Sequence, residues 1–259
     1  ALNMGADMCV QSAHKTLPAL TGGAFLHMNE RVDADRLLSR VALTQSSSPS
    51  FLIMASLDSA REYMDEHGRT ELSRVADECE RVLDECRTLD IMPAREYFGL
   101  DCDRTRIALD VTPRGITGFA ARDALTRMGI DIEMADARRI VMICSAVDDK
   151  DKFDALIDGL KRLPRGNGNY ALPKVERVMR GRRAMSVRQA ALGAYERVEL
   201  ERAAGRIAAR ALGAYPPGVA ECAPGEEISR EICERLLAAQ RAGAELFGLE
   251  RGLCVVTRE

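Results

Sequence analysis

The sequence has no tryptophan and few aromatic residues, and lysine is scarce, with five lysines among 37 basic residues. No apolar run approaches the roughly 18–20 residues that a membrane-spanning helix requires. The chain also has no large excess of one charge, with 37 basic and 40 acidic residues. This balance provides no positive electrostatic field that would attract nucleic acid or anionic lipid. Hydrophobic residues nevertheless make up 46% of the 259 residues, which excludes wholesale disorder and favours real cores.

The spacing of the cysteines and histidines does not indicate a metal site. The eight cysteines form no C-x-x-C pair, and there are only three histidines to join them. Zinc ligation needs closely spaced pairs or nearby histidines. Cysteines scattered through apolar stretches are more typical of reduced, buried side chains, so we expect no metal and a cytoplasmic protein.

The order of apolar and polar segments predicts an α/β fold in three parts. The first part is 1–60, the second a small α/β domain over 61–165, and the third a C-terminal domain over 166–259. The chain starts inside a packed-looking segment without an initiator Met or a signal-peptide pattern, and we expect it to be part of a longer protein. The expected strands are 8–10, 24–28, 106–111, 140–144 and 253–256. The expected helices are 49–66, 70–89, 117–128, 148–163, 201–211 and 229–244.

A local basic patch follows the Pro/Gly/Asn loop at 163–169. It consists of Arg177, Arg180, Arg182 and Arg183. A solvated connector explains these arginines better than phosphate binding, although both interpretations are open.

The stretch from Gln11 to Gly23 is the one segment whose residues indicate chemistry. Lys15 stands between two apolar strands, where desolvation would favour its neutral, nucleophilic amine. A buried ammonium needs either a carboxylate partner, such as Asp7, or a covalent role such as a Schiff base with a carbonyl. Ser12 and His14 would supply a hydroxyl and a ring nitrogen near a phosphate. This pattern suits pyridoxal 5'-phosphate, and a structural lysine is the alternative.

Four ordered motifs resemble one enzyme family. The segment SAHKTLPALTGGAFLH at 12–27 resembles the cofactor-lysine motif of the bacterial ornithine/lysine/arginine decarboxylases. The stretches QSSSPSFLIMASLD at 45–58, GIDIEMADARRIVMI at 129–143 and AYPPGVAECAPGE at 214–226 agree with the same family in the same order. The family usually has a proline where Ala220 follows PPGV, so the local shape of that loop differs.

The resemblance implies a fold and a set of site residues. The fold would be the C-terminal part of an aspartate-aminotransferase-like, fold-type-I domain with the cofactor lysine in 1–60, followed by the small α/β domain and a decarboxylase C-terminal domain. Lys15 would bind pyridoxal phosphate covalently, Ser12 its phosphate, and His14 the phosphate or the cofactor imine. Ser46 would reach the phosphate of a partner subunit's cofactor in a homodimer, with plain helix capping by Ser46–Ser48 as the alternative. Glu226 would bind the distal cation of the substrate, with a solvated loop carboxylate as the alternative.

The implied activity is decarboxylation of arginine, lysine or ornithine to an amine that serves as a polyamine or its precursor, with release of CO₂. In this family the aspartate that pairs with the pyridine nitrogen and the ring-stacking histidine lie upstream of the lysine motif, so we expect these 259 residues alone to be inactive. The alternatives are an aminotransferase or lyase of the same fold, or an inactive dimerisation partner.

Overall fold

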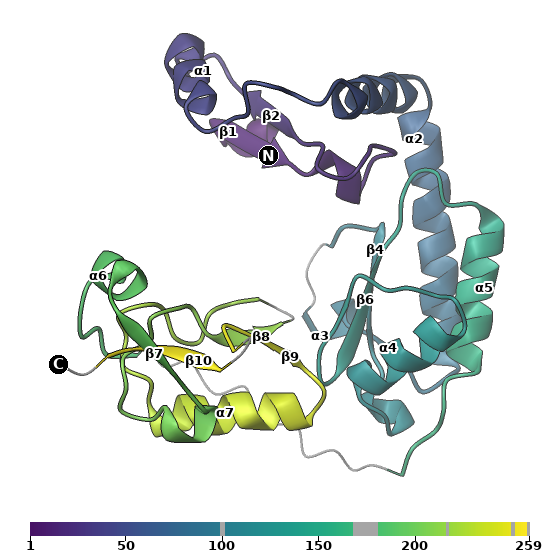
Figure 1. The fold of residues 1–259 in the computed structure, drawn as a ribbon. Helices are drawn as coiled ribbons and strands as arrows, with labels where there is room; N and C mark the ends of the chain where they lie inside the picture. Colours follow the sequence, from purple (N-terminus) through teal and green to yellow (C-terminus); the bar gives the residue numbers. More distant parts are fainter. Residues whose placement is uncertain (99–101, 168–180, 216–217, 250–251, 258–259) are drawn as a thin grey trace. The chain divides into compact units, whose positions relative to one another are not determined.

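The computed structural model describes residues 1–98, 102–167, 181–215, 218–249 and 252–257. The chain divides into two compact units. The first is Ala1–Glu85, Leu100–Ile107 and Met142–Asp158, and the second is Cys86–Gly99, Ala108–Val141 and Gly159–Glu259. Helices and small sheets alternate along the chain, which confirms the α/β class (Figure 1). In the described ranges, no helix is both long and apolar enough to cross a bilayer. Arg177 and Arg180 of the predicted basic patch lie outside the described residues.

The first unit begins with a two-stranded antiparallel sheet. Strands β1 (Met8–Gln11) and β2 (Phe25–Met28) pair from Met8 opposite Met28 to Gln11 opposite Phe25, as the sequence predicted. A short 3-10 turn, η1 (Leu2–Met4), precedes β1, and another, η2 (Ala13–Lys15), follows it. Helix α1 (Ala34–Ala42) was not predicted, although its N-cap signal is in the sequence: the Asp33 side chain accepts a hydrogen bond from the Arg36 N–H.

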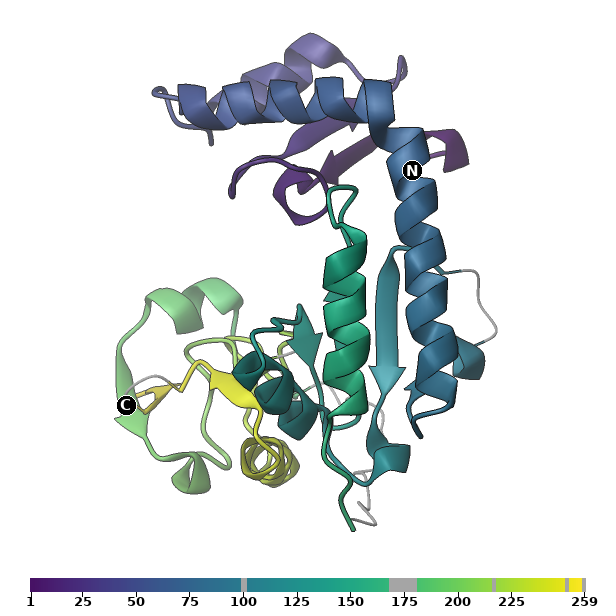
Figure 2. The ribbon, with the colours of Figure 1, turned by 90° about the vertical axis from the view of Figure 1, so that its right-hand side faces the viewer.

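Helix α2 (Phe51–Arg87) is a single helix of 37 residues, so the prediction of two helices separated at Gly68 was wrong. An internal glycine costs about 1 kcal/mol relative to alanine, which packing on both sides can outweigh. Ala60 before Gly68 and Val75 after it are both buried. The helix changes direction along its length (Figure 2).

The C-terminal half of α2 carries the predicted apolar stripe. Val75, Cys79 and Val82 are fully buried at helical spacing. Helix α5 (Lys150–Lys161) lies beside this half of α2 in both ribbon views (Figures 1 and 2). Two arginines of α2 bind the N-terminal region of α5 and the residues just before it. Arg81 pairs with Asp154 at 2.7 Å, and Arg74 donates to the Asp148 carbonyl at 2.7 Å.

A four-stranded sheet follows α2 in the order β3-β4-β6-β5. Its strands are β3 (Met92–Pro93), β4 (Arg106–Asp110), β5 (Met134–Ala135) and β6 (Arg139–Ile143). The connections hold α3 (Arg95–Phe98), the 3-10 turn η3 (Thr112–Arg114) and α4 (Gly118–Arg127). The predicted strands and the Thr117 cap of α4 are confirmed, since the Thr117 side chain accepts from the Ala120 N–H at 3.1 Å.

One buried arginine joins the ends of two helices. Arg114 is only 6% exposed, and its guanidinium donates to three backbone carbonyls. They belong to Leu89, two residues after α2, and to Lys161 and Leu163 at and just after the end of α5, at 2.7–3.0 Å. The last carbonyls of a helix lack partners within the helix, so this side chain satisfies groups that would otherwise be buried without a hydrogen bond.

The second unit also holds an ion pair whose carboxylate is buried. Asp110, at the end of β4, has a fully buried side chain, and one of its oxygens accepts from Nε and Nη2 of Arg138 at 3.0 and 2.6 Å. Its other oxygen accepts from the N–H and hydroxyl of Thr112. Burial alone would raise the pKa of this carboxyl, but the hydrogen bonds from Thr112 and the Arg138 charge outweigh it and lower the pKa below its ordinary value.

We therefore expect Asp110→Asn to lower the free energy of unfolding at pH 7 by about 2–3 kcal/mol, the range of a charge-assisted hydrogen bond. Because the folded-state pKa is depressed, this stability is present above the unfolded pKa of about 4 and is lost as the pH falls through the folded value. Urea titrations from pH 7 to pH 3 should show a shallower loss of stability in Asp110→Asn than in the parent. Asp123→Asn, at an exposed surface pair, is the control, and equal acid sensitivity of all three proteins would contradict the assignment.

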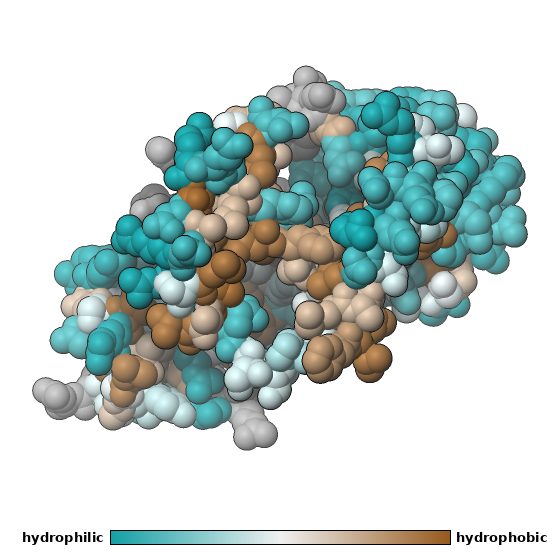
Figure 3. Space-filling view, turned by 90° about the horizontal axis from the view of Figure 1, so that it is seen from above, coloured by the Kyte–Doolittle hydropathy of each residue, from teal (hydrophilic) through white to brown (hydrophobic). Residues whose placement is uncertain are grey.

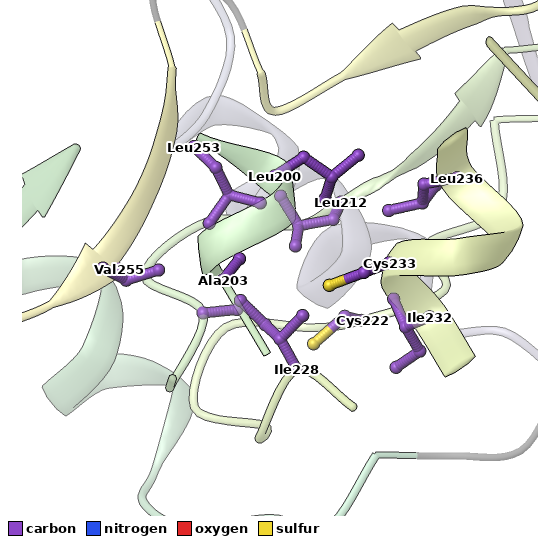
Figure 4. Close-up of a cluster of buried hydrophobic side chains, with 11 residues drawn as sticks. Leu200, Ala203, Leu212, Cys222, Ile228, Ile232, Cys233, Leu236, Leu253 and Val255 are labelled. Atoms are coloured by element: carbon purple, nitrogen blue, oxygen red, sulfur yellow. The ribbon is translucent and has the colours of Figure 1, made fainter. Parts of the chain in front are cut away.

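The C-terminal part of the second unit encloses its own core. Its elements are α6 (Val187–Leu192), β7 (Tyr195–Val198), η4 (Leu200–Arg202), β8 (Gly213–Tyr215), α7 (Arg230–Arg241), β9 (Glu245–Phe247) and β10 (Leu253–Val256). β7 pairs with β10 and β8 with β9, both antiparallel. Leu212, Ile228 and Leu236 are fully buried at the centre of the core (Figure 4). The predicted helix 229–244 and strand 253–256 are confirmed.

The predicted helix at 201–211 was wrong. Only Leu200–Arg202 forms a 3-10 turn, and Gly205 then takes a positive φ of 77°. Beyond it, Ile207 and Ala208 form bridges with Glu227 and Val255. The backbone groups of this alanine-rich segment thus pair with distant segments, and these tertiary contacts override its helix propensity.

Candidate active site

Lys15 lies on a tight turn at the end of β1. Ser12 is extended, and Ala13, His14 and Lys15 form η2. The turn is fixed by the Ala13 carbonyl, which accepts from the N–H groups of Thr16 and Leu17 at 3.1 and 2.8 Å. Because Ala13 is also buried, at 1% exposure, the turn is anchored by its backbone and by one small side chain. The side chains of Ser12 and Lys15 are therefore presented outward from a fixed backbone.

The segment after Lys15 returns to this turn and rests on α2. The Gly23 carbonyl accepts from the His14 N–H at 3.3 Å, and the Leu20 N–H donates to the Ser56 hydroxyl of α2 at 2.7 Å. Gly22 has a φ of 94°, which only glycine adopts readily. A Cβ on Gly23 would lie 2.9 Å from Leu57 Cδ2, so the backbone could not approach α2 as closely with a larger residue.

A cavity of about 540 Å³ opens beside the Lys15 turn. Ser12, Lys15 and Thr16 form one wall, and the opposite residues come from distant points of the sequence but from the same compact unit. They are Leu72 of α2, Asp103, Thr105 and Arg106 at the entry to β4, and Cys144 after β6. Of the described residues that line this cavity, two are cationic, Lys15 and Arg106, and one is anionic, Asp103.

Lys15 is exposed, which contradicts the expectation that the flanking strands would desolvate it. The reason is that β1 and β2 form a sheet of only two strands, and most of their residues are themselves exposed. Asp7, the carboxylate considered as a structural partner, accepts from Arg31 Nε at 2.7 Å and from Asn29 Nδ2 at 3.3 Å. Asp7 thus has a role in holding β1 to the segment after β2.

His14 and Ser46 lie outside the lining of the Lys15 cavity. His14 is half-buried, and the cavity is lined by its neighbours Ala13 and Lys15 but not by His14 itself. Ser46 is exposed in a turn in which its hydroxyl accepts from the Ser48 N–H at 3.1 Å. The helix that follows is capped by Ser50, whose hydroxyl accepts from the Ile53 N–H at 3.4 Å. The interpretation of Ser46–Ser48 as the helix cap was therefore wrong, while the phosphate role of Ser46 stays a prediction.

Glu226 belongs to the second unit. One of its carboxylate oxygens accepts from the Ala223 N–H at 2.9 Å, so the side chain closes the turn of its own Ala-Pro-Gly loop. Burial and the nearby Glu226 charge raise the pKa of the Cys222 thiol to about 12. The proposed contact between Glu226 and a substrate cation stays a prediction.

The eight cysteines, all within the described residues, form no disulfide, and six of them are buried, as predicted; Cys9 is partly buried and Cys102 is exposed. Cys144, at the cavity, is in contact with Cys79 of α2. The Cys79 thiol donates a hydrogen bond to Cys144 and lowers the pKa of Cys144, although burial opposes this shift. The same hydrogen bond and burial raise the pKa of Cys79.

Sequence reasoning missed the wall opposite Lys15. Asp103 and Thr105 precede a strand that was predicted correctly and Arg106 begins it, but nothing in their spacing relates them to a turn about ninety residues earlier. The pattern that could have drawn attention to them is the run of charged and hydroxyl residues at a strand entry, which is also common in solvated loops. Only the fold places them at the cavity.

Large exposed apolar side chains are concentrated in the first 54 residues. Met8 and Val10 of β1, Leu43 after α1, and Phe51 and Leu52 at the start of α2 belong to this group, with exposures of 49–80%. Figure 3 looks onto this part of the molecule and shows hydrophobic surface among the polar side chains. Exposed apolar side chains that form a contiguous patch are typical of a surface that another protein covers.

Two family models match separate parts of the chain. Residues 1–98 match the Orn/Lys/Arg decarboxylase major domain, and residues 169–258 match the Orn/Lys/Arg decarboxylase C-terminal domain. The first match contains the Lys15 turn and α2, and the second contains the core around Leu212 and Leu236.

Two curated bacterial proteins are similar to this chain in sequence. An arginine decarboxylase of Halalkalibacterium halodurans is 29% identical over 267 residues, which cover 96% of this chain and 53% of the relative. The uncharacterized protein YaaO of Bacillus subtilis is 37% identical over 150 residues, covering 55% of this chain and 31% of the relative. The chain thus spans about half the length of the arginine decarboxylase.

The fold is shared with solved enzymes. The constitutive lysine decarboxylase of E. coli superposes with a TM-score of 0.75 at 18% identity, over 96% of this chain and 49% of that one. Lysine decarboxylase A of Pseudomonas aeruginosa gives a TM-score of 0.74 at 18% identity, with the same two coverages. The ordered domain matches, the arginine decarboxylase relatives and this shared fold together identify residues 1–98 and 169–258 as parts of the two corresponding domains of the Orn/Lys/Arg decarboxylase family.

Proposed function

We propose that this chain is part of a pyridoxal-phosphate-dependent decarboxylase of basic amino acids. The main support for the proposal is that Lys15 and Ser12 line the same cavity. Both residues lie in the segment that matches the family's major domain. The sequence relatives are named arginine decarboxylases and the structural neighbours lysine decarboxylases. We therefore propose a basic amino acid as substrate, with arginine, lysine and ornithine as the three to compare.

The residues at the cavity suit the proposed cofactor. Pyridoxal phosphate needs a primary amine for its aldehyde and donors for its phosphate. Lys15 offers the amine, while Ser12 and Thr16 offer hydroxyls on the same turn. The Ser12 hydroxyl does not cap η2, so the turn does not use it. A volume of about 540 Å³ lies within the range of roughly 300–1,000 Å³ typical of small-molecule sites.

Pyridoxal phosphate, when bound, supplies an electron sink for the bond between Cα and the carboxylate of the substrate. The chain's own residues would prepare and complete this chemistry. Lys15 Nζ would bind the cofactor aldehyde until the substrate amine replaces it. The released Lys15 amine would then lie beside the substrate and could return a proton to Cα after CO₂ leaves. Ser12 Oγ would hold the phosphate, while Leu72 presents an apolar wall to the reacting centre.

The proposed activity is tested by following the carboxyl carbon. The protein at its full natural length, loaded with pyridoxal phosphate, should release labelled CO₂ from arginine, lysine or ornithine labelled in the carboxyl group. The same amino acid labelled in its side chain should release no labelled gas, which controls for general degradation. Transfer of the amino group to a keto acid without gas release would instead identify an aminotransferase.

We propose that Ser46 contributes to an active site that two subunits share. Ser46 is exposed and lies outside the Lys15 cavity of its own chain, and apolar residues are exposed nearby on α1 and the start of α2. Both features are typical of a surface that a second copy covers. We propose that the Ser46 hydroxyl donates to the cofactor phosphate of the partner subunit.

Ser46→Ala should weaken cofactor binding by roughly 1.5–3 kcal/mol, the range of one hydrogen bond to a charged group. Titration of a mixed dimer with the change in one subunit should show one weakened site and one normal site. Ser47→Ala and Ser46→Thr are the controls, because the first leaves Ser46 intact and the second keeps the hydroxyl. Two equally weakened sites in the mixed dimer would argue against donation across the interface.

A further inference from the structure

Arg106 is the second cation, besides Lys15, at the cavity beside the Lys15 turn. It begins β4 and lines the same cavity as Ser12 and Lys15, and its side chain is 30% exposed. One of its terminal nitrogens, Nη1, is fully buried and has no hydrogen-bond partner among the residues that the structure describes. A buried donor without an acceptor costs about 1–3 kcal/mol, and more when it is charged. Such a group calls for an explanation by function.

The nearest carboxylate does not satisfy this guanidinium. Asp103 Oδ1 accepts from the N–H and hydroxyl of Thr105 at 2.9 and 2.7 Å. Asp103 Oδ2 lies 3.8 Å from Arg106 Nε, which is too far for a hydrogen bond. Arg106 therefore brings to the cavity a positive charge that its neighbouring carboxylate balances only at long range.

We infer that Arg106 binds the α-carboxylate of the amino-acid substrate, an inference that rests on the proposed function. A basic amino acid brings one anionic group, the carboxylate, and a cationic side-chain end that Arg106 repels. A guanidinium pairs with a carboxylate through two parallel hydrogen bonds, so it fixes orientation as well as charge. With the amine directed to Lys15 and the carboxylate to Arg106, the substrate side chain must leave in a third direction.

This contact has a kinetic signature. The pair exists while the substrate carries its carboxylate and is lost when CO₂ leaves, so Arg106 stabilises bound substrate more than the transition state. Its removal should then raise KM without lowering kcat. The product amine has no carboxylate, and Arg106 contributes nothing to its binding.

The test is Arg106→Gln in the protein at its full natural length, loaded with pyridoxal phosphate. Titration followed by cofactor absorbance should give a Kd for the amino acid that is about 10- to 150-fold higher than in the parent, the factor that corresponds to one charge-assisted hydrogen bond. The Kd of the corresponding amine and the affinity for pyridoxal phosphate should stay within about twofold of the parent values, because Arg106 is not assigned to either. Arg106→Lys should lose less than Arg106→Gln.

Arg104→Gln is the matched control. Arg104 lies two residues away, pairs with Asp77 at 3.2 Å and does not line the cavity. Weakened binding of pyridoxal phosphate in Arg106→Gln would overturn the inference in favour of the cofactor phosphate, the other anion of the site. Equal losses for amino acid and amine, or no loss, would overturn it in favour of a structural role. A parent protein that binds the cofactor but none of the three amino acids would refute the proposed function itself.

Discussion

Lys15→Ala is expected to abolish the covalent cofactor adduct. After reduction with borohydride, mass spectrometry of the parent protein at its full natural length should find a pyridoxyl group on the peptide that contains Lys15, and the variant should carry none. Decarboxylation should fall at least about 100-fold, because the same amine would also move a proton at Cα and general acid–base catalysis alone contributes about 10²–10⁴. The fold should persist, since η2 is held by backbone bonds and by buried Ala13.

Two controls separate covalent bonding from charge. Lys15→Arg keeps the positive charge at the cavity but provides no primary amine, so it too should lose the adduct. Lys150→Ala removes an exposed lysine that pairs with Asp154 on α5 and should behave as the parent. A pyridoxyl mark on another side chain in the parent, or an undiminished adduct in Lys15→Ala, would refute the site assignment.

Arg114→Met should cause the largest loss of stability. The change leaves the buried carbonyl of Leu163 and the partly buried carbonyls of Leu89 and Lys161 without their shared donor. Each unsatisfied buried group costs about 1–3 kcal/mol, so we expect a total loss of about 3 kcal/mol or more. For a domain of this size that corresponds to a decrease in Tm of about 6–12 °C, measured by differential scanning calorimetry.

Arg165→Met is the control for this prediction. Arg165 also carries a guanidinium in the second unit, but it is 67% exposed and pairs with Asp90 at the surface. Its loss should cost no more than about 1 kcal/mol. Arg114→Lys should fall between the two, because an ammonium reaches fewer of the three carbonyls. Equal stability of Arg114→Met and Arg165→Met would contradict the role assigned to Arg114.

Local sequence patterns predicted most of the helices and strands, but they misplaced the break in α2 and predicted a helix at 201–211 that does not form. Alternation over Arg106–Val111 and the stripe through Val75, Cys79 and Val82 identified a strand and a helix, because both patterns record burial directly. Gly68 led to the prediction of a helix break, and the alanine-rich segment 201–211 to the prediction of a helix, and both predictions were wrong for opposite reasons. Packing on both sides keeps α2 helical through a residue of low propensity, while pairing of Ile207 and Ala208 with distant segments unwinds a sequence of high propensity.

Only one side of the candidate site could be predicted from the sequence. The Ser12–Lys15 turn is contiguous, so its residues can be recognised together. Arg106 and Cys144 are brought to it only by the way β4 and β6 meet α2 in the folded chain. The exposure of Lys15 was equally hidden, because it depends on how many strands flank β1 and not on the apolar character of β1 itself.

The contact between Gly23 and Leu57 links the evolution of two distant positions. Since a Cβ on residue 23 would lie 2.9 Å from Leu57 Cδ2, a larger residue there requires the Leu57 side chain to shift or to be smaller. A substitution in the loop that follows Lys15 is thus felt by the helix beneath it, and a substitution at position 57 by the loop. Grafting this loop into another protein would need the matching helical residue to be transferred with it.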